Sequence, residues 1–347
     1  KGEVLEQNHK IENKNIYKIF GTKPESVMPL VESGATKEDV LEQTGHTVGL
    51  DNVSLSIKAG KTFVVMGLSG SGKSTLIRHI NRLIDPTAGQ IIVDGTDIMT
   101  LDKIQLQEFR RKKMSMVFQR FGLMPHKTVL DNVGFGLLAQ GIEEDARHES
   151  SMKQIELVGL QGFEHQYPEQ LSGGMQQRVG LARALTTDPD ILLMDEAFSA
   201  LDPLIRSEMQ RQLIELQKQM RKTIVFITHD LDEALRLGDE IAILNGGRLV
   251  QVGKPEDIVL KPADDYVAAF VADVNKSRVL RAKTIMTSLA DFTLGKRKTE
   301  PVHLETFLED FIPSVLEKRH VISVVDDKGN VKGYISDKEL SSALAKG

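Results

Sequence analysis

The sequence predicts an α/β fold in which a mostly parallel β-sheet is followed by a smaller C-terminal α/β unit. Residues 62–66, 191–194 and 223–227 are short apolar runs with the length and composition of buried strands, and helical segments lie between or after them. Strands that alternate with helices form parallel sheets that are covered on both faces. Three glycines closely follow the first run, which gives the order strand, glycine loop, helix.

Composition and charge narrow the class of protein. The chain has 347 residues, which is enough for one large domain and a smaller one. Its formal net charge of −5 gives no basic excess for a broad electrostatic grip on nucleic acid, so we expect no nucleic-acid partner. It contains no cysteine, which excludes a disulfide framework and a zinc site built from thiolates. A basic run at 110–113 is interpreted as a solvated helix face.

The sequence has no run long enough to cross a bilayer, which takes ~20 apolar residues. The longest apolar stretches, such as 191–194 and 241–244, fall far short of that length. The N-terminal residues are rich in Lys, Glu and Asn and lack the apolar core of a signal peptide. We therefore expect a soluble chain that reaches a membrane only through a partner.

Other elements follow from local patterns. Apolar and polar residues alternate over 47–57, which predicts a half-buried strand, and a helical pattern follows over 74–83. The pair Gly246-Gly247 suits a tight two-residue turn, so it predicts a hairpin between the apolar runs on either side.

The chain is expected to contain two domains. Residues 22–46 form a helical insert, and the mainly helical pattern from about 100 to 190 predicts an inserted helical subdomain. Strand-like runs at 321–335 begin a second small α/β unit. We place the boundary near residue 275, which gives domains 1–275 and 276–347.

A glycine-rich loop joins the strand at 62–66 to the next helix. From Gly67 to Ser74 it fits the spacing G-x-x-x-x-G-K-[ST]. The glycines let successive N–H groups turn toward an anion, and the helix adds the positive end of its dipole. We expect Lys73 to reach the β- and γ-phosphates of a nucleotide and the Ser74 hydroxyl to help hold Mg²⁺. The loop residues expected to bind nucleotide are Ser69, Gly70, Ser71, Gly72, Lys73, Ser74 and Thr75.

Small-molecule kinases, GTPases and motor ATPases share such a loop, so downstream segments must distinguish them. The segment 171–177, Leu-Ser-Gly-Gly-Met-Gln-Gln, is followed about twenty residues later by an apolar strand that ends in Asp195-Glu196. This combination resembles ABC ATPases, which implies a P-loop NTPase fold with a helical subdomain. The resemblance extends to Gln119 in the Q-loop, Asp202 in the D-loop and His229 as the switch histidine.

The resemblance implies an ATP-hydrolysing site. Asp195 ends a buried strand, where a carboxylate can hold the Mg²⁺ shell together with Ser74 and Gln119. Glu196 can polarise the attacking water as a general base, and His229 can orient that water. The expected cofactors are ATP and Mg²⁺, and the expected catalytic residues are Lys73, Glu196 and His229.

Ser172, Gly173 and Gly174 lie just ahead of a helical run and form a second anion-binding helix N-terminus. In ABC ATPases this loop serves the γ-phosphate of the ATP that another copy holds. The resemblance therefore implies a homodimer with two ATP molecules between its subunits.

Adenine stacks on an aromatic residue ahead of the phosphate loop in this family. Phe20 matches that position best, and Tyr17 is the alternative. The insert at 22–46 separates either residue from Gly67 more than is usual.

The resemblance extends to the ATPases of glycine-betaine/proline importers, on segments 66–75, 111–113, 123–126 and 195–206 and on the insert. It implies a peripheral subunit at the cytoplasmic face of the cell membrane. Its partners would be transmembrane permease subunits and a substrate-binding protein or domain. By analogy the cargo is a quaternary-ammonium osmoprotectant. The alternatives are an importer of another small cargo and a soluble ABC ATPase that acts on ribosomes or DNA.

The C-terminal unit resembles CBS (cystathionine-β-synthase-type) modules. Residues 282–287 are similar to the start of one module and 301–342 to another, but the unit is too short for two complete modules. The resemblance implies regulation by cyclic di-AMP or an adenine nucleotide, or by ionic strength. The basic runs 296–298 and 318–320 either meet an anionic ligand or lipid or keep the module soluble.

Overall fold

The computed structural model describes residues 9–119, 122–292, 294 and 297–345. The chain divides into two compact units, Lys1–Val252 and Gly253–Gly347. The division lies ahead of the boundary that we predicted near residue 275. One reason is that Leu260, at the end of α10 (Pro255–Leu260), packs against the core of the C-terminal unit.

A six-stranded sheet forms the centre of the first unit, with the strand order β10-β9-β3-β8-β7-β6. The pairs β3–β8, β3–β9, β7–β8 and β6–β7 are all parallel, as predicted. Every residue of β3, β7 and β8 is buried, which explains their continuous apolar runs. The strands are β3 (Thr62–Met66), β6 (Met114–Val117), β7 (Ile191–Asp195), β8 (Thr223–Thr228), β9 (Glu240–Asn245) and β10 (Arg248–Gly253).

A second sheet in this unit is antiparallel, with the order β2-β1-β4-β5. Only β2 was predicted from the sequence. In β1 the register shifts between Asn13 and Ile16, which breaks the two-residue alternation that marks a strand. The strands are β1 (His9–Phe20), β2 (Thr47–Lys58), β4 (Ala88–Val93) and β5 (Thr96–Asp97).

One apolar core joins the two sheets to helix α3 (Lys73–Ile80). It contains Ile11 and Leu50 from the antiparallel sheet, Phe63 from the parallel sheet, and Leu76 and Ile80 from the helix. The start of α3 is therefore fixed between both sheets, and the glycine loop ahead of it has two anchored ends.

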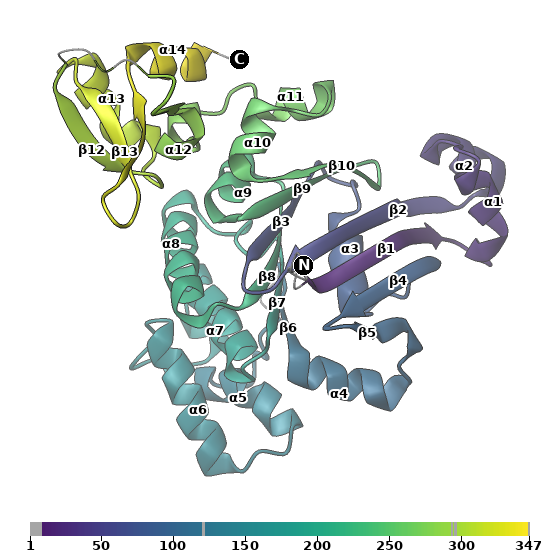
Figure 1. The fold of residues 1–347 in the computed structure, drawn as a ribbon. Helices are drawn as coiled ribbons and strands as arrows, with labels where there is room; N and C mark the ends of the chain where they lie inside the picture. The colour runs from purple at the N-terminus through teal and green to yellow at the C-terminus, as the bar shows by residue number, and fades with distance from the viewer. Residues whose placement is uncertain (1–8, 120–121, 293, 295–296, 346–347) are drawn as a thin grey trace, which may run out of the picture. The chain divides into compact units, whose positions relative to one another are not determined.

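The predicted insert is helical and lies between β1 and β2. It contains a 3₁₀ turn (Pro24–Val27), α1 (Met28–Glu32) and α2 (Lys37–Thr44). Figure 1 shows these helices at the far end of the long β1–β2 ribbon. Val31 and Val40 are buried in a small core of their own with residues of that ribbon.

The described residues of the region 100–190 form four α-helices, and also β6, which the mainly helical prediction missed. Strand β6 is only four residues long and lies at the sheet edge, so its sequence signal is weak. Helix α5 packs against α6 and α7. The helices of the first unit outside the insert and α3 are α4 (Lys103–Lys113), α5 (Val129–Ala139), α6 (Glu144–Leu157), α7 (Gly173–Thr186), α8 (Pro203–Met220) and α9 (Leu231–Leu237).

The second unit has its own four-stranded sheet, with the order β11-β14-β13-β12. Strands β13 (Val321–Val325) and β14 (Val331–Ile335) lie where they were predicted. Phe311 and Leu340 pack in a core beside them. The other elements are α11 (Asp265–Val271), α12 (Ala282–Ile285), β11 (Thr287–Ser288), β12 (Thr299–His303), α13 (Leu308–Leu316) and α14 (Asp337–Ala345). Among the described residues of the whole chain, no helix has the length and apolarity needed to span a membrane.

Candidate active site

The loop between β3 and α3 has the backbone geometry of an anion cradle. Gly67, Gly70 and Gly72 have φ angles of 151°, 76° and 98°, which side chains disfavour. A Cβ atom on Gly67 would lie 2.2 Å from the Leu244 carbonyl oxygen, and one on Gly72 would lie 2.7 Å from the Gly49 carbonyl oxygen. These positions therefore require glycine for both conformation and space.

Lys73, the first residue of α3, is buried at the base of this loop. Its Nζ donates to the carbonyl oxygens of Gly67 at 2.8 Å and Leu68 at 3.0 Å. Burial lowers the pKa of its ammonium, and the carboxylates of Glu196 and Asp195 act in the opposite direction. The loop thus holds a cation next to its own N–H groups.

The side-chain oxygen atoms of Ser74 and Asp195 lie together. The Ser74 hydroxyl donates to Asp195 Oδ1 at 2.8 Å, and Asp195 is buried at the end of β7. No group of three or more His, Cys, Asp or Glu side chains in the described ranges could hold a metal by itself. Mg²⁺ does not need such a group, because it binds through one or two carboxylates together with substrate phosphates and water. The Ser74–Asp195 pair fits that chemistry.

Glu196 is the point where several predicted site residues meet. Its carboxylate lies 4.0 Å from Lys73 Nζ and 3.5 Å from His229 Nδ1, and it accepts a hydrogen bond from Gln119 Nε2 at 3.4 Å. Its backbone has a φ of 46°, which is unfavourable for a residue with a side chain. The side chain is 20% exposed, so it is held by neighbours and still reaches solvent.

A cavity of about 500 Å³ lies over the loop. Its volume is within the range of sites for small molecules and cofactors. Phe20 lines this cavity, whereas Tyr17 lines a different one beside Arg248. Of the predicted residues, those that line it are Phe20, Ser69, Gly70, Gly72, Lys73, Ser74, Thr75 and Glu196.

Two further groups of predicted residues do not line this cavity. Ser172 caps α7 and accepts a hydrogen bond from the Met175 N–H, and Gly173 and Gly174 form the first turn. Asp202 caps α8 in the same way and accepts from two N–H groups at 3.1 Å each. A loop that completes the nucleotide site of a second copy would lie away from the cavity of its own copy, as these residues do. Ser71 is buried beneath the loop and does not line the cavity either.

Sequence reasoning missed Lys37, which comes from α2 of the insert and also lines the cavity. Nothing in its sequence neighbourhood resembles a phosphate-binding pattern. Its place depends on how the insert folds back.

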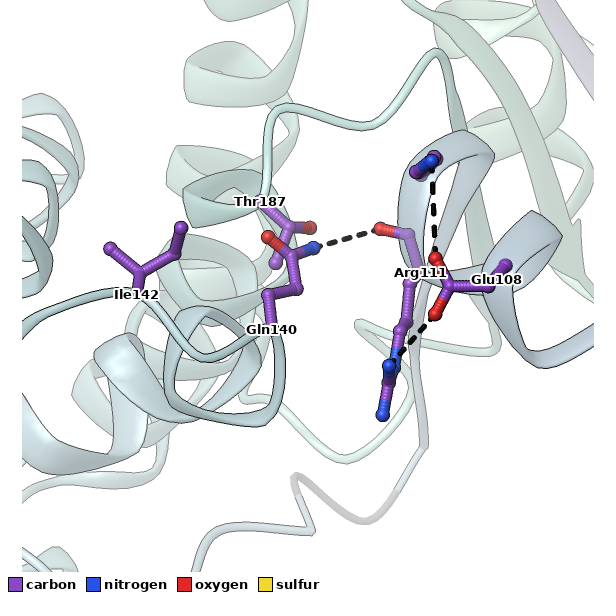
Figure 2. A pocket seen from close by; sticks show the side chains of 6 residues that line it. Glu108, Arg111, Gln140, Ile142 and Thr187 are labelled. Atoms are coloured by element: carbon purple, nitrogen blue, oxygen red, sulfur yellow. Dashed lines mark hydrogen bonds and ion pairs between the residues drawn. The ribbon is translucent and has the colours of Figure 1, made fainter. Parts of the chain in front are cut away.

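The basic run at the end of α4 is only partly the solvated face that we predicted. Arg110 donates to two backbone carbonyls that follow α3, and Lys113 bridges two aspartates. Arg111 pairs with Glu108 at 2.9 Å beside a cavity of about 370 Å³ (Figure 2). Arg110 and Lys113 therefore tie α4 to its neighbours, whereas the Arg111 pair lies within the helix.

One described residue of each basic run in the second unit contacts a carboxylate. Lys296 lies outside the described residues, and Arg297 donates to Asp337 at 2.9 Å. His320 lies 3.3 Å from Glu300.

Comparisons with known proteins agree with this geometry. A family model described as ABC transporter matches residues 50–199. The chain is 56% identical to the glycine betaine transport ATP-binding protein OpuAA of Bacillus subtilis, over 98% of this chain and 82% of that protein. It is also 56% identical to the glycine betaine/proline betaine transport system ATP-binding protein ProV of Escherichia coli, over 96% of this chain and 82% of that protein.

Solved structures give the same result for the fold. The dimeric structure of MJ0796, a bacterial ABC transporter cassette, is 33% identical with a TM-score of 0.60, over 71% of this chain and 98% of that one. A post-hydrolysis dimer of the same cassette, bound to ADP and Pi, is similar at 32% identity and a TM-score of 0.60.

Proposed function

The chain belongs to the family of ABC transporter ATP-binding proteins, and we propose that its ATPase activity powers the import of glycine betaine or a related quaternary-ammonium osmoprotectant. The observation that carries the ATPase part is the meeting of Lys73, Gln119 and His229 at the carboxylate of Glu196. A cation for phosphate and a base for water lie together over one glycine loop, which is the arrangement that phosphoryl transfer to water requires.

Each of these residues has a distinct part in the proposed reaction. The Lys73 ammonium binds the β- and γ-phosphates once it leaves the Gly67 and Leu68 carbonyls. Glu196 takes the proton of the attacking water. His229 and the Gln119 amide hold the Glu196 carboxylate in place, and His229 also orients the water and contacts the γ-phosphate.

Ser74 and Asp195 are the proposed Mg²⁺ residues, together with Gln119. When bound, Mg²⁺ neutralises charge that develops on the phosphate oxygens. The buried position of Asp195 at the strand end fixes one carboxylate oxygen against the Ser74 hydroxyl.

The working unit in this proposal is a homodimer. Ser172, Gly173 and Gly174 present the N-terminus of the long helix α7, and Asp202 begins α8, but none of them lines the cavity of their own copy. They serve the γ-phosphate of the ATP held by the second copy. The similar MJ0796 cassette has a dimeric structure, which supports this assembly.

Relatives of the chain indicate the cargo. The printed names of OpuAA and ProV include glycine betaine transport, and both are 56% identical to this chain. Two proteins named trimethylamine N-oxide transport ATP-binding protein TmoW are 42% and 44% identical, so this N-oxide is the second candidate cargo. The partners are permease subunits and a substrate-binding protein or domain, which hold the chain at the cytoplasmic face of the membrane.

The experiment is reconstitution of the chain with its membrane and substrate-binding partners in lipid vesicles that contain ATP. We expect uptake of labelled glycine betaine that depends on ATP. Unlabelled betaine should compete better than unlabelled trimethylamine N-oxide. Uptake that only trimethylamine N-oxide supports would replace the proposed cargo, and ATP-independent uptake would remove the proposed role of this subunit.

The C-terminal unit is a CBS-type regulatory module in this proposal. It contains a cavity of about 390 Å³ between α12 and α14, with Lys338 on its wall. The wall also carries Glu339 and the hydroxyl groups of Thr284, Thr287 and Ser342, so Lys338 is the one cation among its described lining residues and is the residue suited to the phosphate of an adenine nucleotide or cyclic di-AMP. Titration calorimetry with each nucleotide tests this idea. Lys338→Ala should weaken binding, whereas Lys328→Ala, in an exposed turn, should not.

A further inference from the structure

The helical insert contributes a cation to the nucleotide cavity. Lys37 is the first residue of α2, and its side chain lines the cavity together with Ser69, Gly70 and Lys73. The helix start is well fixed: the Thr36 hydroxyl accepts from the Asp39 N–H at 3.1 Å, and the Asp39 carboxylate accepts from the Thr36 N–H at 3.0 Å. The side chain of Lys37 therefore extends from a defined position.

The Lys37 ammonium has no anionic partner of its own. Among the residues that the structure describes, no carboxylate lies within 4.0 Å of it and no hydrogen bond is made by it, although it is half-buried. Burial lowers the pKa of Lys37, and the more distant charges of Glu38 and Asp51 only partly offset this effect. A half-buried cation without a partner is costly, and an anionic ligand would relieve that cost.

The neighbours of Lys37 indicate which part of a nucleotide it meets. A Cβ atom on Gly247 would lie 3.2 Å from Lys37 Nζ and 2.8 Å from the Gly49 carbonyl oxygen. Gly49 in turn lies between two ends of the cavity. A Cβ atom on Gly49 would lie 2.6 Å from the Phe20 ring, and one on Gly72 would lie 2.7 Å from the Gly49 carbonyl oxygen.

Lys37 thus lies beside Gly247, close to the Gly49 carbonyl oxygen, and Gly49 itself approaches both Phe20 and Gly72. Phe20 marks the end proposed for adenine, and Gly72 and Lys73 mark the end proposed for the terminal phosphates. The group that lies between them in ATP is the ribose with its α-phosphate. An ammonium pairs with phosphate oxygens by charge-assisted hydrogen bonds.

We propose that Lys37 is a nucleotide-binding residue supplied by the insert, and that its ammonium pairs with the α-phosphate of ATP and ADP. The inference rests on the proposed ATPase function and adds a contact that the phosphate loop does not provide. It gives the insert a role, because α2 then places a cation where the nucleotide binds.

The test compares Lys37→Met with Lys23→Met in the full chain. Lys23 lies in the same insert and is exposed, and its substitution by methionine removes the same charge, so Lys23→Met is the control. Affinities for adenosine, AMP, ADP and ATP are measured by titration calorimetry, and KM and kcat by phosphate release. We expect Lys37→Met to bind AMP, ADP and ATP about tenfold more weakly and to raise KM by the same factor, because a charge-assisted hydrogen bond is lost.

Three further readouts make the result specific. In Lys37→Met, the affinity for adenosine and kcat at saturating ATP should stay within about twofold of the parent values. Lys23→Met should match the parent chain in every measurement. Lys37→Arg should recover most of the affinity for AMP, ADP and ATP. The proposal would be overturned if Lys37→Met bound ATP as tightly as the parent chain or more tightly. It would also be overturned if the variant lost as much affinity for adenosine as for ATP. If the parent chain bound no nucleotide at all, the proposed ATPase function would fail, and this inference with it.

Discussion

The Lys73 ammonium lies 4.0 Å from the Glu196 carboxylate and also donates to two backbone carbonyls of the glycine loop. The residue proposed to bind phosphate and the residue proposed to activate water therefore meet at one point. A γ-phosphate drawn to Lys73 would arrive beside the base. This relationship makes the role of Glu196 separable from nucleotide binding.

Glu196→Gln should separate these two roles. Glutamine keeps the size of the side chain and its contacts with Gln119 and His229, but it cannot accept the proton of water. We expect kcat to fall by at least about 100-fold, as for loss of a general base, while ATP still binds and two molecules stay trapped in a dimer. Phosphate release and gel filtration with ATP measure both effects. Glu215→Gln, on the exposed face of α8, is the control, and normal hydrolysis in Glu196→Gln would refute the assignment of the base.

Gly173 and Gly174 should respond differently to alanine. A Cβ atom on Gly174 would lie 2.4 Å from the Ile205 side chain of α8, whereas one on Gly173 would meet nothing within 4 Å. Gly174→Ala should therefore lower the free energy of unfolding by about 1–3 kcal/mol, and Ile205→Ala should restore part of it. Chemical denaturation measures both variants.

Gly173→Ala tests the dimeric site, because it leaves packing intact. We expect unchanged stability and ATP affinity for the separate chain, with a strong loss of hydrolysis in the assembled protein. Hydrolysis at the parent rate would show that this turn does not approach the γ-phosphate of the second copy.

Phe20→Ala should weaken ATP binding, because Phe20 lines the cavity over the phosphate loop. Stacking of a base on an aromatic ring contributes roughly 1–3 kcal/mol, so KM should rise at least about fivefold. Phe20→Tyr should preserve the affinity. Tyr17→Ala, at a residue that lines another cavity, should leave KM unchanged. The opposite pattern would move the adenine to Tyr17.

The elements that the sequence predicted best are the strands whose residues are all buried. Strands β3, β7 and β8 are buried on both faces, so their apolar runs are continuous and their bounds were nearly correct. Strand β1 was missed because it has bulges and one wet face. Which of its side chains are buried depends on its pairing with β2 and β4, and the local sequence pattern does not indicate this pairing.

The same distinction holds for the site. The phosphate loop and the Asp195-Glu196 pair follow from short-range spacing, since each depends on a strand that ends where the chemistry begins. The position of Lys37 depends on how the insert folds back beside Gly247. The spacing of residues along the sequence therefore gave no signal for its place in the cavity. The choice between Phe20 and Tyr17 also needed the tertiary structure, because two residues three apart face different cavities.

Glu233, in α9 shortly after His229, should make stability depend on pH. It is buried and accepts a hydrogen bond from Gln210 at 3.1 Å. Burial raises the pKa of its carboxyl above the ordinary value, although hydrogen bonds from Thr228 and Gln210 oppose the shift. In the unfolded chain the group loses its proton near its ordinary pKa of about 4.3.

The sign of the effect follows from these two pKa values. Below the unfolded pKa both states are protonated, and the contribution of Glu233 to stability is fully present. As the pH rises between the two values, the unfolded state releases its proton first, so the free energy of unfolding falls until the pH passes the folded pKa. Glu233→Gln cannot titrate, so its stability should decline less over this window than that of the parent, by an amount that Glu215→Gln does not reproduce. Urea unfolding followed by circular dichroism from about pH 4 to about pH 8 measures the slopes. Parallel slopes for Glu233→Gln and the parent would mean that the folded carboxyl titrates as it does in the unfolded chain.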